Sequence, residues 1–90
     1  MSARQVWKYP VPFGDVPIRL MVPKDGIIVH FDVQRVDTVW VEVNPESPER
    51  LCVLQWFGTG HPLPEGASHV GTVIRGNFVW HLYKLKDQAA

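Results

Sequence analysis

The sequence predicts an all-β protein, folded as a compact antiparallel sandwich or a small barrel of about seven short strands. Apolar and polar residues alternate along most of the chain, which is the period of a strand with one buried face. Turn-forming residues recur at the spacing of about 8–12 residues that is typical of all-β domains. No window carries a sustained apolar stripe of helical period between capping residues. These observations together favour packed sheets over a helical architecture.

The central part of the chain carries the clearest strand patterns. Residues 27–34 alternate strictly between the two faces of a strand, and residues 38–43 do the same. The short link at residues 35–37 predicts a hairpin between them. Residues 51–57 form the third clear candidate, and the turn-rich segment at residues 44–48 precedes it.

Four further segments are expected to complete the sheets. Residues 69–74 and 77–85 flank a tight turn, in which Gly76 and Asn77 are expected to supply positive φ angles. Residues 5–9 and 18–22 are shorter candidates, each closed by a proline. Proline lacks the amide that a sheet ladder needs, so both segments are expected to be edge strands or to end where the prolines begin.

Length and composition indicate one soluble domain over residues 1–90, with residues 1–4 and 87–90 expected to be frayed. Nine basic and nine acidic residues cancel, so a nucleic acid or an anionic membrane is not an expected partner. The N-terminus lacks the apolar core of a signal peptide, and no apolar run is long enough to span a membrane. Cys52 stands alone within an apolar run, which excludes a disulfide framework. These features predict a cytoplasmic location.

Catalytic and metal-binding motifs are missing from the sequence. The four histidines, at positions 30, 61, 69 and 81, do not form any short motif of metal-ligand spacing. Ser68 precedes His69, but no nucleophile elbow surrounds it. We therefore expect neither a metal nor a cofactor, and we expect a protein that is not an enzyme. A small nucleotide hydrolase using His61 is one alternative.

The most unusual segment is Phe-Gly-Thr-Gly-His-Pro-Leu-Pro at residues 57–64. Gly58 and Gly60 allow positive φ angles, and successive amides in such a turn can form a concave site for an anion. His61 precedes Pro62, which holds it extended beside those amides. This predicts a phosphate or carboxylate site, with a purely structural turn as the other interpretation.

Aromatic side chains are abundant for so small a domain, at 11% of the chain. Both faces of residues 51–57 and 78–85 are apolar or aromatic, so both require cover. Either a homo-oligomer or a stacked ligand would provide that cover, and a large core closed by the N-terminal segment is the alternative. The predicted ligand-binding residues are Gly58, Thr59, Gly60, His61, Lys8, Tyr9, Trp80 and His81. The predicted interface residues are Trp7, Trp40, Trp56 and Tyr83.

Four blocks of the sequence are distinctive: Trp-Lys-Tyr-Pro at residues 7–10, the segment at residues 57–64, Gly71-Thr72, and Phe-Val-Trp-His at residues 78–81. Together they resemble a family of small uncharacterised bacteriophage and prophage proteins. The resemblance implies a viral or virus-derived protein in the cytoplasm of a bacterial host. It carries over no catalytic residues, because the family has none assigned.

The resemblance and the residues together predict a phage accessory protein, a counter-defence inhibitor that acts by stoichiometric binding. Its partner would be a host defence protein or a small nucleotide-like ligand. A protein–protein interaction module or a structural module of the virion is the alternative to this function.

Overall fold

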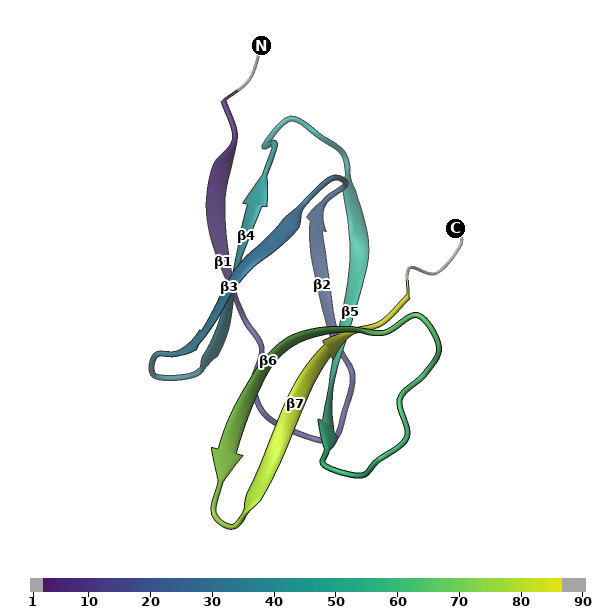
Figure 1. Cartoon of the computed structure of the whole chain (residues 1–90). Coiled ribbons are helices and arrows are strands. Elements are labelled where there is room, and N and C mark those ends of the chain that lie inside the picture. The colour runs from purple at the N-terminus through teal and green to yellow at the C-terminus, as the bar shows by residue number, and fades with distance from the viewer. Residues whose placement is uncertain (1–2, 87–90) are drawn as a thin grey trace.

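The computed structural model describes residues 3–86, and within this range the chain forms seven strands and no helix. The strands are β1 (Gln5–Pro10), β2 (Ile18–Pro23), β3 (Ile27–Val33), β4 (Asp37–Val43), β5 (Glu49–Gly58), β6 (Ser68–Arg75) and β7 (Phe78–Lys84). All of their pairings are antiparallel, and they build two packed sheets (Figure 1). The predicted all-β sandwich is thereby confirmed.

The two sheets are a three-stranded sheet of order β1-β4-β3 and a four-stranded sheet of order β2-β5-β7-β6. Both proline-terminated strands, β1 and β2, lie at sheet edges as expected, because Pro10 and Pro23 cannot donate to a neighbouring strand. The β3–β4 and β6–β7 hairpins also match the predicted pairings. In the second hairpin Gly76 has a φ of 61°, whereas the expectation of a positive φ at Asn77 is wrong.

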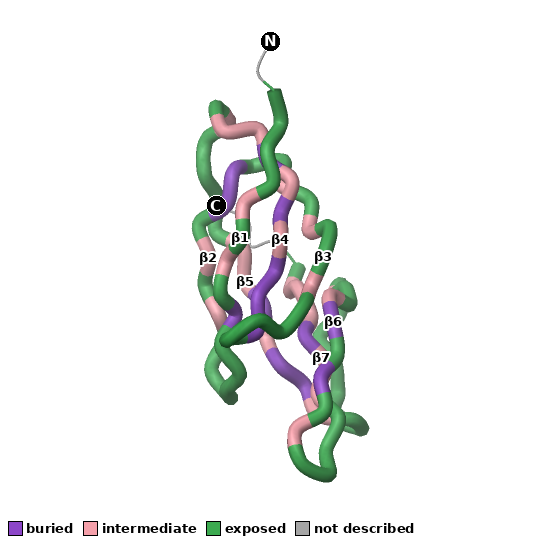
Figure 2. The backbone as a smooth tube through the Cα atoms, turned by 90° about the vertical axis from the view of Figure 1, so that its left-hand side faces the viewer, coloured by how far each residue is buried: buried purple, intermediate pink, exposed green. Residues whose placement is uncertain are grey.

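The core lies between the sheets and follows the alternation of the strands. Val39, Val41 and Val43 of β4 are buried, and they face Leu54 of β5 and Leu82 of β7 from the other sheet. Figure 2 shows that the buried positions run along β4, β5 and β7. The alternation of apolar and polar residues along each strand therefore indicates which side chains enter the core.

An ion pair joins the two sheets at one end of the sandwich. Asp37 begins β4, Arg75 ends β6, and one terminal nitrogen of Arg75 donates to both carboxylate oxygens of Asp37 at 2.6 and 2.7 Å. The Asp37 side chain is 1% exposed and that of Arg75 is 39% exposed. The Arg75 guanidinium also lies 5.4 Å from the centre of the Phe13 ring. The amide of Val11 donates to the carbonyl of Asp37, so the segment after β1 joins the same cluster.

The edge strands β3 and β6 meet through Phe31 and Gly71. A Cβ atom at Gly71 would collide with the Phe31 ring, so only glycine lets this ring pack against the backbone of β6. Phe31 also meets Trp56 edge-on, with ring centres 5.9 Å apart. The ring therefore links β3 both to the edge and to the interior of the opposite sheet.

The expectation of frayed ends is corrected in part. Arg4 is tied down, because its guanidinium donates to the Glu42 carboxylate at 2.7 Å and to the carbonyls of Glu42 and Asp25. Residues 1–2 and 87–90 lie outside the described residues.

Tyr9 carries a polar atom into the space between the sheets. Its hydroxyl is buried and has no hydrogen-bond partner among the described residues. Burial raises the pKa of Tyr9 above its ordinary value of 10.0, and the negative charges of Glu49 and Cys52 add to the effect. The fold therefore favours the neutral phenol over the phenolate.

We predict that Arg75→Met lowers the free energy of unfolding by about 3 kcal/mol, because it leaves the Asp37 carboxylate buried and unpaired. The matched control is Arg4→Met at the Arg4–Glu42 pair, in which the arginine is similarly exposed, at 38%, but the acid is 41% exposed. That change is expected to cost about 1 kcal/mol or less. Urea unfolding of both variants measures the difference, and equal losses would contradict the role given to Asp37.

We also predict that Tyr9→Phe raises the free energy of unfolding by up to about 1 kcal/mol near neutral pH, because the buried hydroxyl lacks a partner. In the parent protein, Tyr9 of the unfolded chain loses its proton at a lower pH than Tyr9 of the folded protein. As the pH rises above 10.0 and through the raised pKa of the folded state, the free energy of unfolding therefore falls. Urea unfolding at about pH 8 and about pH 11 tests both statements. An identical alkaline loss in parent and variant would argue against them.

Candidate functional site

The turn that opens the β5–β6 loop is built by glycine and histidine together. Gly60 has a φ of 92°, as expected, but Gly58 has no positive φ. The reason for glycine at position 58 is space, since a Cβ atom there would lie 2.9 Å from Cε1 of His61 and 3.2 Å from the Trp80 ring. The His61 ring is thus packed against the backbone of β5 and the edge of Trp80.

Three amides of this turn donate hydrogen bonds inside the protein. Gly58 donates to Nδ1 of His61 at 3.2 Å, Thr59 donates to the carbonyl of Val79, and His61 donates to the carbonyl of Gly58. The anion cradle expected at residues 57–64 requires these amides to be free. The geometry supports the alternative interpretation of this segment, a structural turn in which His61 is a hydrogen-bond acceptor.

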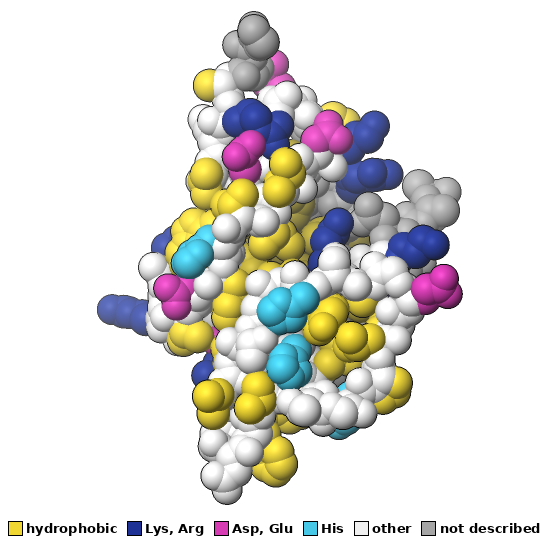
Figure 3. Space-filling view, viewed as in Figure 1, with side chains coloured by type: hydrophobic (Ala, Val, Ile, Leu, Met, Phe, Trp, Pro, Cys, Tyr) yellow, Lys and Arg dark blue, Asp and Glu magenta, His cyan; other side chains and the backbone are white. Residues whose placement is uncertain are grey.

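A chain of histidines and threonines lies on the outer face of the four-stranded sheet. Nε2 of His69 lies 2.9 Å from Oγ1 of Thr72, and Nδ1 of His81 lies 3.1 Å from the same oxygen. On its other side, Nε2 of His81 lies 2.9 Å from Oγ1 of Thr59, which donates to the carbonyl of Val79 at 3.1 Å. We call these four residues the histidine–threonine chain. Figure 3 shows histidines gathered beside an apolar patch on this face, bordered by the β5–β6 loop.

A β-bulge places His69 in this chain. On β7, His81 and Tyr83 are two residues apart and share a face, but their partners on β6, Thr72 and His69, are three residues apart. The β-bulge is the register shift between His69 and Gly71, where β6 contains one residue more than β7. In a regular strand His69 and Thr72 would point to opposite faces, which is why the sequence pattern did not reveal them as neighbours.

The predicted ligand-binding residues do not assemble into one site. Thr59 and His81 belong to the histidine–threonine chain, and Trp80 faces the interior, where its ring meets Phe13 at 5.2 Å. Lys8 and Tyr9 belong to β1 in the other sheet. Lys8 is exposed there and donates to the side chain of Gln34 at 3.4 Å.

The predicted interface residues are also dispersed. Trp56 is 4% exposed and belongs to the core, so the expectation that it lies at an interface is corrected. Trp7 packs against the core, and the Trp40 ring lies tilted beside that of His30, with 5.3 Å between ring centres. Tyr83 meets both Phe57 and His69 edge-on. A far more exposed aromatic side chain is Phe78, at 68%, which the sequence analysis did not assign to the interface.

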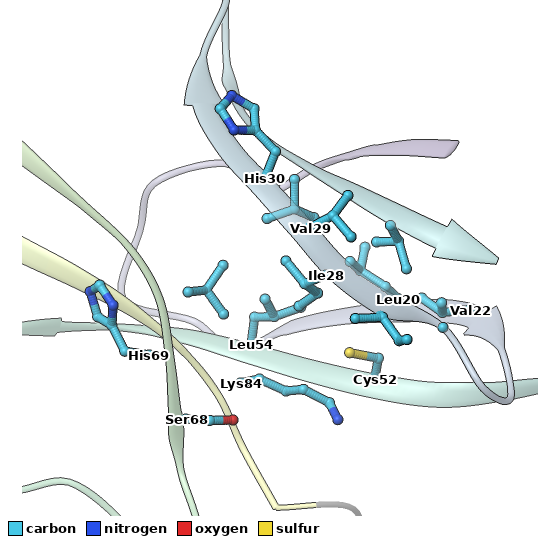
Figure 4. A pocket seen from close by; sticks show the side chains of 15 residues that line it. Leu20, Val22, Ile28, Val29, His30, Cys52, Leu54, Ser68, His69 and Lys84 are labelled. Atoms are coloured by element: carbon cyan, nitrogen blue, oxygen red, sulfur yellow. The ribbon is translucent and has the colours of Figure 1, made fainter. Parts of the chain in front are cut away.

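A cavity of about 400 Å³ opens between the two sheets. Its lining comes from both sheets and consists of Leu20, Val22, Gly26, Ile27, Ile28, Val29, His30, Val39, Val41, Cys52, Leu54, Ser68, His69, Val70 and Lys84. Figure 4 shows the aliphatic side chains converging on its centre while His30 and His69 lie at the edge, and Figure 3 shows the hollow from outside. We call this cavity the inter-sheet cleft. Sequence reasoning missed it because its aliphatic lining has the pattern of an ordinary core.

Metal and membrane sites receive no support within residues 3–86. This part of the chain contains no group of three or more histidine, cysteine, aspartate or glutamate side chains that could hold a metal ion. It also contains no helix with the length and apolar character needed to cross a bilayer.

The fold and these surfaces define the class of the protein, a small all-β sandwich with a partly open interior. The chain belongs to the family described as a domain of unknown function, DUF7352, whose model matches residues 2–90. No curated protein and no solved structure matches the chain. The family description names no activity, ligand or source, so the resemblance to bacteriophage proteins stays a prediction.

The geometry of the turn predicts the effect of removing its histidine. His61→Ala deprives the Gly58 amide of its acceptor, so this amide should exchange with solvent faster and the free energy of unfolding should fall by about 1 kcal/mol. Hydrogen exchange followed by NMR measures the first effect. His30→Ala is the control, because His30 lies exposed on the other sheet. Unchanged protection of Gly58 would contradict the structural role of His61.

Proposed function

We propose that the protein acts by stoichiometric binding, without catalysis, and that the inter-sheet cleft is its binding site. The observation that carries the proposal is the cleft itself, since its volume of about 400 Å³ lies within the range of about 300–1,000 Å³ usual for small-molecule sites. An ordinary sandwich fills this space with side chains at close packing. Here it is open to solvent and predominantly aliphatic.

The chemistry of the lining defines the class of ligand. Val39, Val41 and Leu54 are buried aliphatic residues, so the inner part of the cleft favours an aromatic or aliphatic body. The polar groups of Ser68 and Lys84 come from the four-stranded sheet (Figure 4). The positive charge of Lys84 favours an anionic group on the ligand. The ligand is therefore a small amphipathic molecule, with an apolar body and a negatively charged head.

This binding mode is compatible with the function expected from the bacteriophage resemblance. A counter-defence protein that sequesters a host nucleotide signal would place the flat base in the cleft and a phosphate toward Lys84. The proposed site differs from the one expected from sequence, because the amides of Gly58, Thr59 and His61 in the turn after β5 are already hydrogen-bonded. The inter-sheet cleft takes the place of that turn in the proposal.

The dye 1-anilinonaphthalene-8-sulfonate is a suitable probe, because it combines an aromatic body with an anionic group. We expect it to bind one molecule per chain and to slow the alkylation of Cys52 by iodoacetamide, since Cys52 lines the cleft and is the single cysteine of the sequence. The mass increase of the intact protein measures the alkylation rate. An unchanged rate at saturating dye would contradict the assignment of the cleft.

A matched pair of substitutions tests the location further. Cys52→Phe places a ring inside the cleft and should weaken dye binding about tenfold or more, which corresponds to about 1.4 kcal/mol. Val53→Phe is the control, because adjacent residues of a strand point to opposite faces. Thermal unfolding establishes that both variants fold. Equal binding by the two folded variants would place the dye elsewhere.

A further inference from the structure

The histidine–threonine chain has a fixed direction, because it ends at a carbonyl group. The carbonyl of Val79 can only accept, so the single hydroxyl proton of Thr59 is donated to it. Oγ1 of Thr59 must then accept from His81, which places a proton on Nε2 of that ring. The neutral His81 ring therefore has an unprotonated Nδ1.

The hydrogen bonds keep this direction to the far end of the chain. Since Nδ1 of neutral His81 is an acceptor, the hydroxyl of Thr72 donates to it. Oγ1 of Thr72 then accepts from His69, so the proton of neutral His69 also lies on Nε2. Every donor of the chain is used, and the ring nitrogen left with an available lone pair is Nδ1 of His69.

We propose that His69 and His81 form a pair that shares one proton through Thr72, and that the protonated pair binds a small oxyanion at Nδ1 of His69. A proton taken up at Nδ1 turns this atom from an acceptor into a donor. The charge can then pass to His81 as the Nε2 proton of His69 moves to Oγ1 of Thr72 and the hydroxyl proton of Thr72 moves to Nδ1 of His81. In both arrangements Nδ1 of His69 carries a proton that can be donated to the anion.

The shared hydroxyl resists the uptake of a second proton. With both rings charged, His69 and His81 would each donate to Oγ1 of Thr72, whose own proton would lose its acceptor within the chain. The ring centres are 6.3 Å apart, so the two charges would also repel each other. The geometry of the pair therefore favours one added proton over two.

The surroundings of the pair favour an external anion. The ion pairs found within residues 3–86 are Arg4–Glu42, His30–Asp32 and Arg75–Asp37, so neither His69 nor His81 has a carboxylate partner there. The other titratable or charged side chains of the adjoining elements are Tyr83 and Lys84 on β7, Arg75 on β6, and His61 and Glu65 on the β5–β6 loop. Of these, Tyr83 contacts His69 edge-on, at 5.3 Å between ring centres.

The proposed anion site adjoins the inter-sheet cleft, because His69 also belongs to the lining of the cleft. Thr59, Thr72 and His81 do not line it. The hydrogen-bond direction along the histidine–threonine chain does not depend on a ligand in the cleft, so a failure of dye binding would leave this inference standing.

Nitrogen-15 NMR of the imidazole rings in the intact protein tests the hydrogen-bond direction. At alkaline pH we expect both His69 and His81 as Nε2-protonated tautomers, and on acidification we expect the first proton taken up to shift the resonances of both rings. Thr72→Ser keeps the hydroxyl and should preserve this coupling, whereas Thr72→Val should remove it. An Nδ1-protonated tautomer of either ring at alkaline pH, or coupling that survives in Thr72→Val, would overturn the proposal.

Sulfate is the probe for the anion, because it does not change its charge in the relevant pH range. We expect sulfate to shift the His69 and His81 resonances, and its association constant to fall by up to tenfold per pH unit on the alkaline side, since binding takes up one proton. Sodium chloride at equal ionic strength is the control for screening, and His30 is the control residue, since it lies exposed on the other sheet. Equal shifts of His30 and His69, or binding that does not depend on pH, would overturn the proposal.

Discussion

The sandwich depends on the ion pair between Asp37 and Arg75. Asp37 starts the central strand of one sheet and is almost fully buried, so its charge requires a partner from the other sheet. Arg75 provides that partner from the end of β6 and rests against Phe13. The carbonyl of Asp37 also accepts a hydrogen bond from the amide of Val11. One acidic residue thereby fixes the relative position of both sheets and of the segment that passes between them.

The predictable part of the fold is the part that local chemistry determines. The alternation of apolar and polar residues located the strands, because successive side chains of a strand point to opposite faces. Pro10 and Pro23 marked edge strands, because proline lacks an amide hydrogen to donate. The conformation of Asn77 was not predictable from its residue type, since Gly76 alone supplies the positive φ of that turn. The pairing of Asp37 with Arg75 was also hidden, because it joins residues 38 positions apart.

The candidate sites were harder to predict because they depend on packing between elements. Thr59 and His81 were both predicted to bind a ligand, and in the structure their side chains meet. His69 joins them through a bulge, which alternation alone does not reveal. The glycine-rich turn was misleading, because the acceptors that occupy its amides include His61 itself and Val79 of another strand. The inter-sheet cleft arises from how far the sheets stand apart, which the residues of one strand do not encode.

The order of the strands has a consequence for how the chain folds. Each sheet contains one hairpin of sequence neighbours, β3–β4 in one sheet and β6–β7 in the other. The pairings of β1 with β4 and of β2 with β5 each close a long loop, and those two loops interleave along the chain. Loop closure costs entropy before its contacts form, so the hairpins can form early and the interleaved edge strands join later. Folding of this small domain is therefore limited by the search for distant partners.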